Sequence, residues 1–305
     1  MMASHKYVAL LILLILSSCK KAEDRNHHQY QIVTTTNILA DAVKALVRDS
    51  AEVESLMAIG VDPHLYKTSQ RDLDKLFDAD LVIYQGFYLE GKMNEVLKKF
   101  ARTNQVLSVE SYLSPELLLK DEAFENSVDP HLWFDPVTWK EVMRGLAEKL
   151  IHIHPGWEAY LLDNLNAYEQ QMEQLDVELK EKINRLPADK RILVTAHDAF
   201  AYFGKAYGFE VKGLQGLSTL SEPGLNDVTR LVQYISEHRI KAIFSEQSIS
   251  PRGVKALVEG CRRNGHEVTL AGPLYTDSLG EPDGPAGTYL RMLRYNMEMI
   301  VENLR

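Results

Sequence analysis

Short runs of β-branched and aliphatic residues alternate with amphipathic helical patterns along most of the chain. In the first half, the pattern predicts strands at 31–36, 53–58, 81–85 and 105–109, with helices at 38–47, 70–77 and 90–100. The alternation starts again after Pro187, with strands expected at 192–196, 210–213, 242–246 and 267–271, and helices at 200–207, 225–238 and 252–264. Such alternation is typical of βαβ units. We therefore expect an α/β fold with two similar lobes, each built on a parallel sheet.

A longer helical pattern lies between the two halves. Apolar side chains recur at helical spacing from Tyr160 to Ile183, and neither Gly nor Pro interrupts them. A helix of about 30 residues is roughly 45 Å long, which is enough to cross both lobes. We expect one long, rigid backbone helix over 155–186, joining an N-terminal lobe at 30–154 to a C-terminal lobe at 187–305.

The N-terminus has the pattern of an export signal. Residues 8–16 form an apolar run that is too short to cross a bilayer, and Leu16-Ser17-Ser18-Cys19 follows it. Small residues before a cysteine, with a polar stretch after it, match the lipobox of bacterial lipoproteins. We expect a signal peptide over 1–19 that ends at a lipidated Cys19, and a polar tether over 20–29. A plain signal peptide with an incidental cysteine is the alternative. The protein is expected to be exported and anchored to a bacterial membrane, in the periplasm or at the cell surface.

Composition and charge narrow the class of partner. The 305 residues are 45% hydrophobic and 25% charged, which is typical of a soluble globular protein with two domains. The net charge of -9 argues against a nucleic-acid partner, because phosphate backbones are bound by clustered Lys and Arg. If Cys19 carries lipid, Cys261 is the one remaining cysteine, so an internal disulfide is excluded. We expect Cys261 to be a buried structural thiol on a helix.

Four side chains with metal-binding chemistry lie at or after predicted strand ends. His64 follows the second strand and His131 lies beyond the fourth, whereas His197 ends the strand that opens the second half and Asp277 follows the last strand. In open α/β sheets, ligands bind at the carboxyl ends of the strands. We therefore expect the four side chains to meet in one cleft between the lobes. Three neutral imidazoles and one carboxylate suit a borderline divalent metal.

The first two histidines lie in a repeated sequence, because Val-Asp-Pro-His-Leu occurs at 61–65 and again at 128–132. The preceding proline in each copy fixes its own φ, which reduces the entropy lost in placing the imidazole. The other histidines lie in the signal, the tether, helix ends or polar segments, and we do not expect them to bind the metal. They are His5, His27, His28, His152, His154, His238 and His266.

Longer stretches around these residues carry a family resemblance. From about Ile32 to the C-terminus, the chain resembles the zinc- and manganese-receptor family of substrate-binding proteins for bacterial ATP-binding-cassette importers, and above all its treponemal TroA-type members. The landmarks are VTTTNILAD at 33–41, GVDPHLY at 60–66, ADLVIY at 79–84, DPHLWFD at 129–135, TAHDAF at 195–200 and YTDSLG at 275–280.

The resemblance implies a function and a ligand set. In this family, two histidines of the N-terminal lobe and two ligands of the C-terminal lobe bind the metal, which makes His64, His131, His197 and Asp277 the expected ligands. It further implies a monomer that captures zinc or manganese and delivers it to the membrane permease of an ABC importer, and no enzymatic activity.

The sequence features that distinguish zinc receptors from manganese receptors in this family point to different metals. Zinc-specialised relatives often have a His-rich loop and a disulfide, whereas 111–127 contains no histidine here. Manganese-specialised relatives commonly have Glu as third ligand, where this chain has His197. Imidazoles favour zinc over manganese. We expect zinc or manganese, with zinc slightly ahead and iron not excluded.

Two alternative functions stay open at this point. A metal-dependent hydrolase could use the same His3Asp site, with Glu246 as the one plausible general base. The preferred interpretation of Glu246 is a carboxylate that supports a ligand, because the sequence contains no HExxH, GxSxG or phosphate-binding glycine motif. The other alternative is a surface adhesin, for which the sequence offers neither support nor contradiction.

Overall fold

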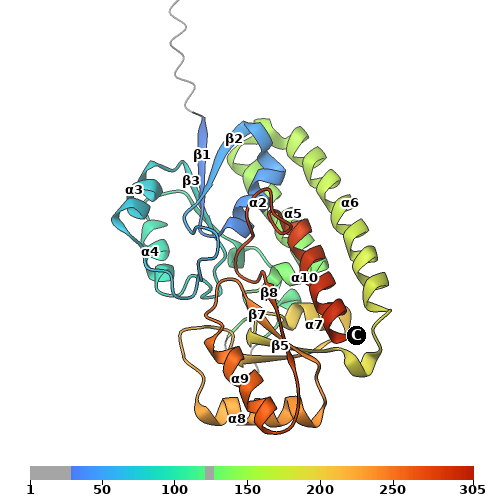
Figure 1. Cartoon of the computed structure of the whole chain (residues 1–305). Coiled ribbons are helices and arrows are strands. Elements are labelled where there is room, and N and C mark those ends of the chain that lie inside the picture. Colours follow the sequence, from blue (N-terminus) through green and yellow to red (C-terminus); the bar gives the residue numbers. More distant parts are fainter. Residues whose placement is uncertain (1–28, 121–126) are drawn as a thin grey trace, which may run out of the picture.

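The computed structural model describes residues 29–120 and 127–305 (Figure 1). The predicted signal peptide, its Cys19 and nearly all of the tether therefore lie outside the described residues. Within the described ranges, no helix is both long and apolar enough to cross a membrane.

The N-terminal half contains a four-stranded parallel sheet with the strand order β2-β1-β3-β4. The strands are β1 (Tyr30–Thr34), β2 (Ala51–Ser55), β3 (Leu81–Tyr84) and β4 (Val106–Ser108). Helices follow the first three strands: α2 (Asn37–Val47), α3 (Gln70–Asp78) and α4 (Met93–Phe100). All four residues of β3 are buried, as expected for an inner strand with both faces covered.

The C-terminal half repeats this alternation. Its strands are β5 (Ile192–His197), β6 (Glu210–Gln215), β7 (Ala242–Glu246) and β8 (Thr269–Leu274), and its connecting helices are α7 (Ala201–Tyr207), α8 (Leu225–Glu237) and α9 (Arg252–Arg263). The strands pair in parallel as β5-β6 and β7-β8, and β5 packs beside β7. The predicted α/β class with two parallel-sheet halves is confirmed, although the hydrogen-bonded ladders of this half are two-stranded.

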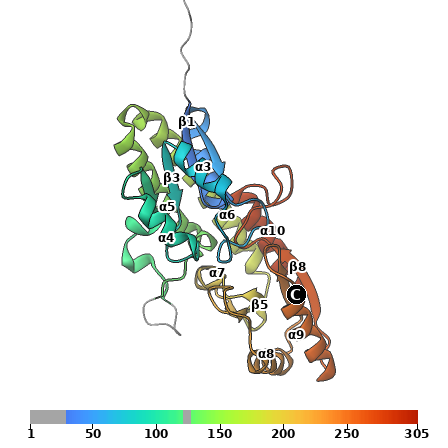
Figure 2. The same cartoon turned by 90° about the vertical axis from the view of Figure 1, so that its left-hand side faces the viewer.

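The long connecting helix is α6 (Glu158–Ile183), with 26 residues. It begins later than the predicted 155–186 because Pro155–Trp157 forms a separate 3-10 turn. Figure 1 shows α6 running along one side of the molecule, and Figure 2 shows the two halves one above the other. It packs against α2, α5 (Pro136–Ile153) and α10 (Tyr289–Leu304). The lobe boundaries expected from the sequence stay a prediction.

One hydrophobic core extends through both halves. Its buried side chains come from α2, α5, α6, α7 and α10, with Leu46, Leu146, Met172, Phe203 and Met297 as examples. Phe134, next to the start of α5, stacks on Phe200 next to α7 with ring centroids 4.2 Å apart. Because close-packed cores tolerate little sliding, this shared core opposes large movements between the halves.

Candidate metal centre

The loops at the strand ends bring the four predicted side chains together. His64 lies between β2 and α3, His131 between β4 and α5, His197 at the end of β5, and Asp277 after β8. Each is buried and offers one ligand atom, and these atoms all lie within 4.8 Å of one another. The prediction that four residues from both halves meet in one place is confirmed by this geometry.

Two of the imidazoles are oriented by carboxylates. The Nδ1 atom of His131 lies 2.7 Å from Asp129 Oδ1, and the Nδ1 atom of His197 lies 2.6 Å from Glu246 Oε2. Each carboxylate accepts a hydrogen bond from the ring N–H, so Nδ1 carries a hydrogen and Nε2 is the nitrogen left to bind a metal. Metal-binding histidines are commonly held in this way.

The two Nε2 atoms and the carboxylate of Asp277 face one another. The Nε2 atoms of His131 and His197 are 3.4 Å apart. Asp277 Oδ1 lies 3.4 Å from Nε2 of His131, and Asp277 Oδ2 lies 3.5 Å from Nε2 of His197. Two ligand atoms that are each about 2.0–2.1 Å from one tetrahedral zinc ion are roughly 3.4 Å apart. The separations therefore fit the ligands of a single ion.

Buried polar atoms without partners also indicate a cation. Both ring nitrogens of His64 and both carboxylate oxygens of Asp277 are buried and make no hydrogen bond with any described residue. Buried polar atoms are normally hydrogen-bonded, because leaving them unpaired costs about 1–3 kcal/mol each. A cation bound among these donor atoms would satisfy them, so the residues present fit a metal.

The electrostatics of the cluster also favour a bound cation. Burial lowers the pKa of His131, but the charges of Asp129 and Asp277 outweigh it and raise that pKa to about 10. The pKa of His197 is also raised, since Glu246 and Asp277 outweigh its burial. Burial would raise the pKa of Asp277, yet His197 and His131 hold it below its usual range. The carboxylates thus favour positive charge at the imidazoles.

His64 differs from the other two imidazoles. Burial lowers its pKa to about 3, and the attraction of Asp277 does not compensate. Among the described residues, no carboxylate accepts a hydrogen bond from its ring, in contrast with His131 and His197. Its centroid lies 5.5 Å from that of His131 and 5.8 Å from that of His197.

Glu246 does more than contact one ring. Its Oε1 accepts the backbone N–H of His197 at 2.9 Å, and its Oε2 accepts the hydroxyl of Thr276 at 2.9 Å. The register of β7 and β8 shifts between Phe244 and Glu246, which places Glu246 opposite Leu274. Glu246 therefore links the strand end that carries His197 to the loop that carries Asp277.

The repeated Val-Asp-Pro-His-Leu sequence has a second physical basis that the sequence analysis missed. In each copy, Oδ1 of the aspartate accepts the backbone N–H of the histidine two residues later, at 2.9 Å for Asp62 and His64 and at 2.9 Å for Asp129 and His131. This is the turn geometry that Asp favours. The repeated Asp, placed two residues before each His, was the signal that could have revealed it.

Other histidines of the described structure, which the sequence did not indicate as ligands, lie away from the cluster, and Cys261 is also separate from it. His238 and His266 contact the backbone carbonyls of Tyr234 and Ile240, and His154 stacks on Trp157, so none of these joins the cluster in the described structure. His5, His27 and His28 lie outside the described residues. Cys261 is a free, buried thiol on α9, as expected.

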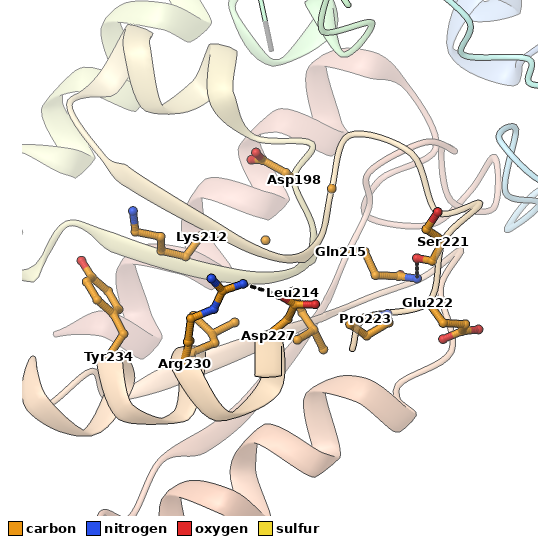
Figure 3. A pocket seen from close by; sticks show the side chains of 13 residues that line it. Asp198, Lys212, Leu214, Gln215, Ser221, Glu222, Pro223, Asp227, Arg230 and Tyr234 are labelled. Atoms are coloured by element: carbon orange, nitrogen blue, oxygen red, sulfur yellow. Dashed lines mark hydrogen bonds and ion pairs between the residues drawn. The ribbon is translucent and has the colours of Figure 1, made fainter. Parts of the chain in front are cut away.

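One hollow on the surface is separate from the four clustered side chains. It has a volume of about 840 Å³ and lies between β6 and α8, where Lys212, Arg230 and Tyr234 line it (Figure 3). Its polar side chains are largely engaged with their neighbours, since Arg230 pairs with Asp227 and Gln215 donates to the Ser221 carbonyl. We therefore assign no ligand to it.

Comparisons with known proteins identify metal-uptake and metal-binding proteins as relatives of this chain. The family model described as "Zinc-uptake complex component A periplasmic" matches residues 32–303. The chain is 42% identical to the manganese-binding lipoprotein MntA of Bacillus subtilis over 277 residues, covering 91% of this chain and 90% of that protein. It is 40% identical to the zinc-binding protein TroA of Treponema pallidum over 275 residues, covering 90% and 88%.

The fold comparison agrees with the sequence comparison. The solved structure of the periplasmic zinc-binding protein TroA from Treponema pallidum superimposes with a TM-score of 0.87. It covers 90% of this chain and 99% of that chain at 40% sequence identity. The similarity therefore extends over both halves and the helix between them.

Proposed function

Because this chain belongs to the zinc-uptake complex component A family, we propose that it is the extracytoplasmic metal receptor of a bacterial ABC importer. It binds one divalent transition metal, zinc or manganese, and delivers the ion to a membrane permease. The observation that carries this proposal is the convergence of four buried ligand atoms, from both halves of the chain, within 4.8 Å.

His64, His131, His197 and Asp277 bind the metal in this proposal. His131 and His197 coordinate through Nε2, because their Nδ1 atoms donate to Asp129 and Glu246. Asp277 is the one anionic ligand and offsets part of the cation's charge in a site from which water is excluded. Asp129 and Glu246 orient the rings and increase their basicity.

Zinc is the cargo that the ligand chemistry favours. Three imidazoles are softer ligands than the oxygen-rich sets that manganese prefers. The names of the two relatives refer to different metals, manganese in Bacillus and zinc in Treponema, so the family relationship supports either ion. Manganese is therefore the alternative cargo, and iron is tested beside it.

A hydrolase function is not supported. The family is described as a zinc-uptake component and both relatives are named as metal-binding proteins, and this chain is likewise a receptor and not an enzyme. Glu246, the candidate general base, accepts hydrogen bonds from His197 and Thr276. The adhesin alternative has no support from the relatives either.

The relatives named as lipoproteins support an exported protein that is anchored to a membrane. We propose Cys19 as the residue that carries the lipid, and the flanking tether as the spacer that separates the receptor from the membrane surface. The receptor acts as a monomer, and its partner is the permease of the importer.

Competitive metal loading tests this function. Protein refolded without metal is offered equimolar zinc, manganese and iron, with copper excluded, and bound metal is measured by elemental analysis. We expect one ion per chain, with zinc preferred. His131→Ala should lose this binding, whereas His238→Ala, a change at an exposed histidine, should keep it. Wild-type protein that retains no metal would refute the proposal.

A further inference from the structure

The three imidazoles of the cluster are not held equally. Carboxylates orient the rings of His131 and His197, whereas neither ring nitrogen of His64 has a hydrogen-bond partner within 29–120 and 127–305. The position of the His64 ring therefore depends on the backbone of its own loop, and on whatever holds that loop in place.

Two contacts fix the His64 backbone. Its N–H donates to Asp62 Oδ1 at 2.9 Å, and its carbonyl oxygen packs against Gly91. A Cβ atom at Gly91 would lie only 2.3 Å from that oxygen, and Gly91 has a φ of +49°, so glycine is required there. The His64 backbone is thus held on one side by close packing against Gly91, and on the other side by the hydrogen bond to Asp62.

The two aspartates of the repeated motif use their second oxygen differently. Asp129 Oδ2 is buried and has no hydrogen-bond partner in the described structure, because Oδ1 alone serves both the backbone and the ring of His131. Asp62 Oδ2 accepts the hydroxyl of Thr219 at 2.6 Å. Thr219 belongs to the loop between β6 and α8, in the opposite half of the chain.

The contact between Asp62 and Thr219 borders an open space. Thr219 is buried, and both residues line a cavity of about 450 Å³ together with Leu65, Gln215 and Arg252. The cavity has walls from both halves, so Asp62 and the His64 loop would have room to move if the bond to Thr219 broke. The hydrogen bond to Thr219 ties Asp62 to the opposite half on the side of this cavity.

A second contact between the halves remains if that bond is lost. Ser278, next to Asp277, accepts the backbone N–H of Gly60 at 2.9 Å and the side-chain amide of Asn37 at 3.0 Å. The two halves therefore stay in contact here without the Thr219 hydroxyl, whose own contact is with Asp62, two residues before His64.

We propose that Thr219 is a positioning residue for the metal ligand His64, and that its hydrogen bond to Asp62 sets how long the bound metal stays. The inference rests on the proposed function, since it assigns a role in retaining the same cargo. Loss of the bond lets the His64 loop shift into the adjoining cavity, so that His64 is the first ligand to leave the ion.

Thr219→Val tests this inference, because it removes the hydroxyl and keeps the shape of the side chain. Zinc-loaded protein is mixed with excess EDTA, and the dissociation rate is followed in a stopped-flow instrument. Because a hydrogen bond to a charged group is lost, we expect dissociation about tenfold faster than in the wild type. The metal-free protein should melt at the wild-type temperature.

Two matched variants complete the test. Thr219→Ser keeps a hydroxyl and should release zinc at nearly the wild-type rate. Thr229→Val makes the same change at an exposed helix position, where the hydroxyl donates to the Leu225 carbonyl, and should also leave the rate unchanged.

The outcomes separate this inference from the proposed function. Wild-type protein that binds no zinc refutes the function. If the wild type binds one zinc ion but Thr219→Val releases it at the wild-type rate, this inference alone is wrong. It is equally wrong if Thr219→Ser releases zinc as fast as Thr219→Val, or if Thr219→Val lowers the melting temperature of the metal-free protein.

Discussion

The Nε2 atoms of His131 and His197 lie 3.4 Å apart and belong to opposite halves of the chain. Two lone pairs that face each other at this distance repel, so a proton or a metal ion must lie between the two nitrogens. The arrangement becomes favourable when a cation lies between them, and the buried carboxylate of Asp277 strengthens this preference. The site therefore depends on both halves at once.

The first prediction concerns metal-dependent stability. A metal that binds the folded protein stabilises it by mass action, and the gain grows with affinity. Zinc should raise the melting temperature of the wild type strongly, and Asp277→Asn should reduce this gain to a small fraction, because the anionic ligand is lost. Thermal melts with and without zinc measure the difference.

Asp283→Asn serves as the control for this experiment, because Asp283 is an exposed carboxylate near the same loop. It should show the full wild-type gain on zinc addition. An Asp277→Asn protein that is stabilised as much as the wild type would contradict the role of Asp277 as a ligand.

A second prediction concerns Glu246. Glu246→Gln keeps an acceptor for the backbone of His197 but removes the negative charge beside its ring. Zinc affinity should fall about 10–100-fold, as is usual when a partner of a metal-binding histidine is changed. Competition with a chelating dye measures the dissociation constant.

Glu259→Gln is the matched change on the exposed surface of α9, where Glu259 pairs with Arg262 and Arg263. Its zinc affinity should equal that of the wild type. Equal affinities for the two variants would mean that Glu246 does not act on His197.

The third prediction is a pH dependence. Without metal, the pKa of His131 is about 10, so at pH 7.5 this imidazole carries a proton that the metal must displace. Because proton and metal compete for the same ring, lowering the pH favours the protonated, metal-free form. Zinc affinity should weaken about tenfold for each pH unit below neutrality through this one group.

Calorimetry provides a direct count of the proton. Zinc titrations at pH 7.5 in buffers with different ionisation enthalpies should reveal the release of about one proton per ion bound. A heat of binding that is identical in all buffers would show that no proton leaves, and His131 would then not be a protonated ligand before binding.

The fourth prediction concerns the membrane anchor. Cys19→Ala removes the thiol on which the lipid would be built, so the variant should leave the membrane fraction or stay unprocessed. Cys261→Ala is the control, since Cys261 is buried in α9 and distant in sequence from the signal. Fractionation and immunoblotting measure both. Wild-type membrane partitioning of the Cys19 variant would argue against lipidation.

Local patterns were sufficient for much of the architecture. The buried, β-branched run of β3 was recognisable because inner parallel strands are apolar on both faces. The helix α6 was recognisable because its apolar side chains, from Leu161 to Ile183, keep helical spacing without Gly or Pro. Its start was misplaced by three residues, because Pro155 is compatible with either a helix or a 3-10 turn.

The four clustered side chains could also be identified from the sequence. His197 lies at a strand end and the other three lie in segments that follow strand ends, and the topology of parallel sheets brings strand ends to a common edge. Cys261 could be placed from helical periodicity, since its spacing from the apolar residues of the same helix indicated a buried position. The sequence by itself therefore determined the element order, the α/β class and the candidate ligands, because these depend on local periodicity and on topology.

The sequence indicated Glu246 as a carboxylate that supports a ligand, but which side chain contacts which ligand was decided by the tertiary structure. Identical Val-Asp-Pro-His-Leu sequences produce an aspartate that holds the ring of His131 and another that reaches Thr219, 157 residues away. Glu246 at the end of β7 contacts His197 at the end of β5, and the number of residues between them does not indicate that the two side chains meet. Hydrogen bonds between side chains need donor–acceptor distances that are correct to within a few tenths of an ångström, and such distances arise only when the two halves pack on their shared core.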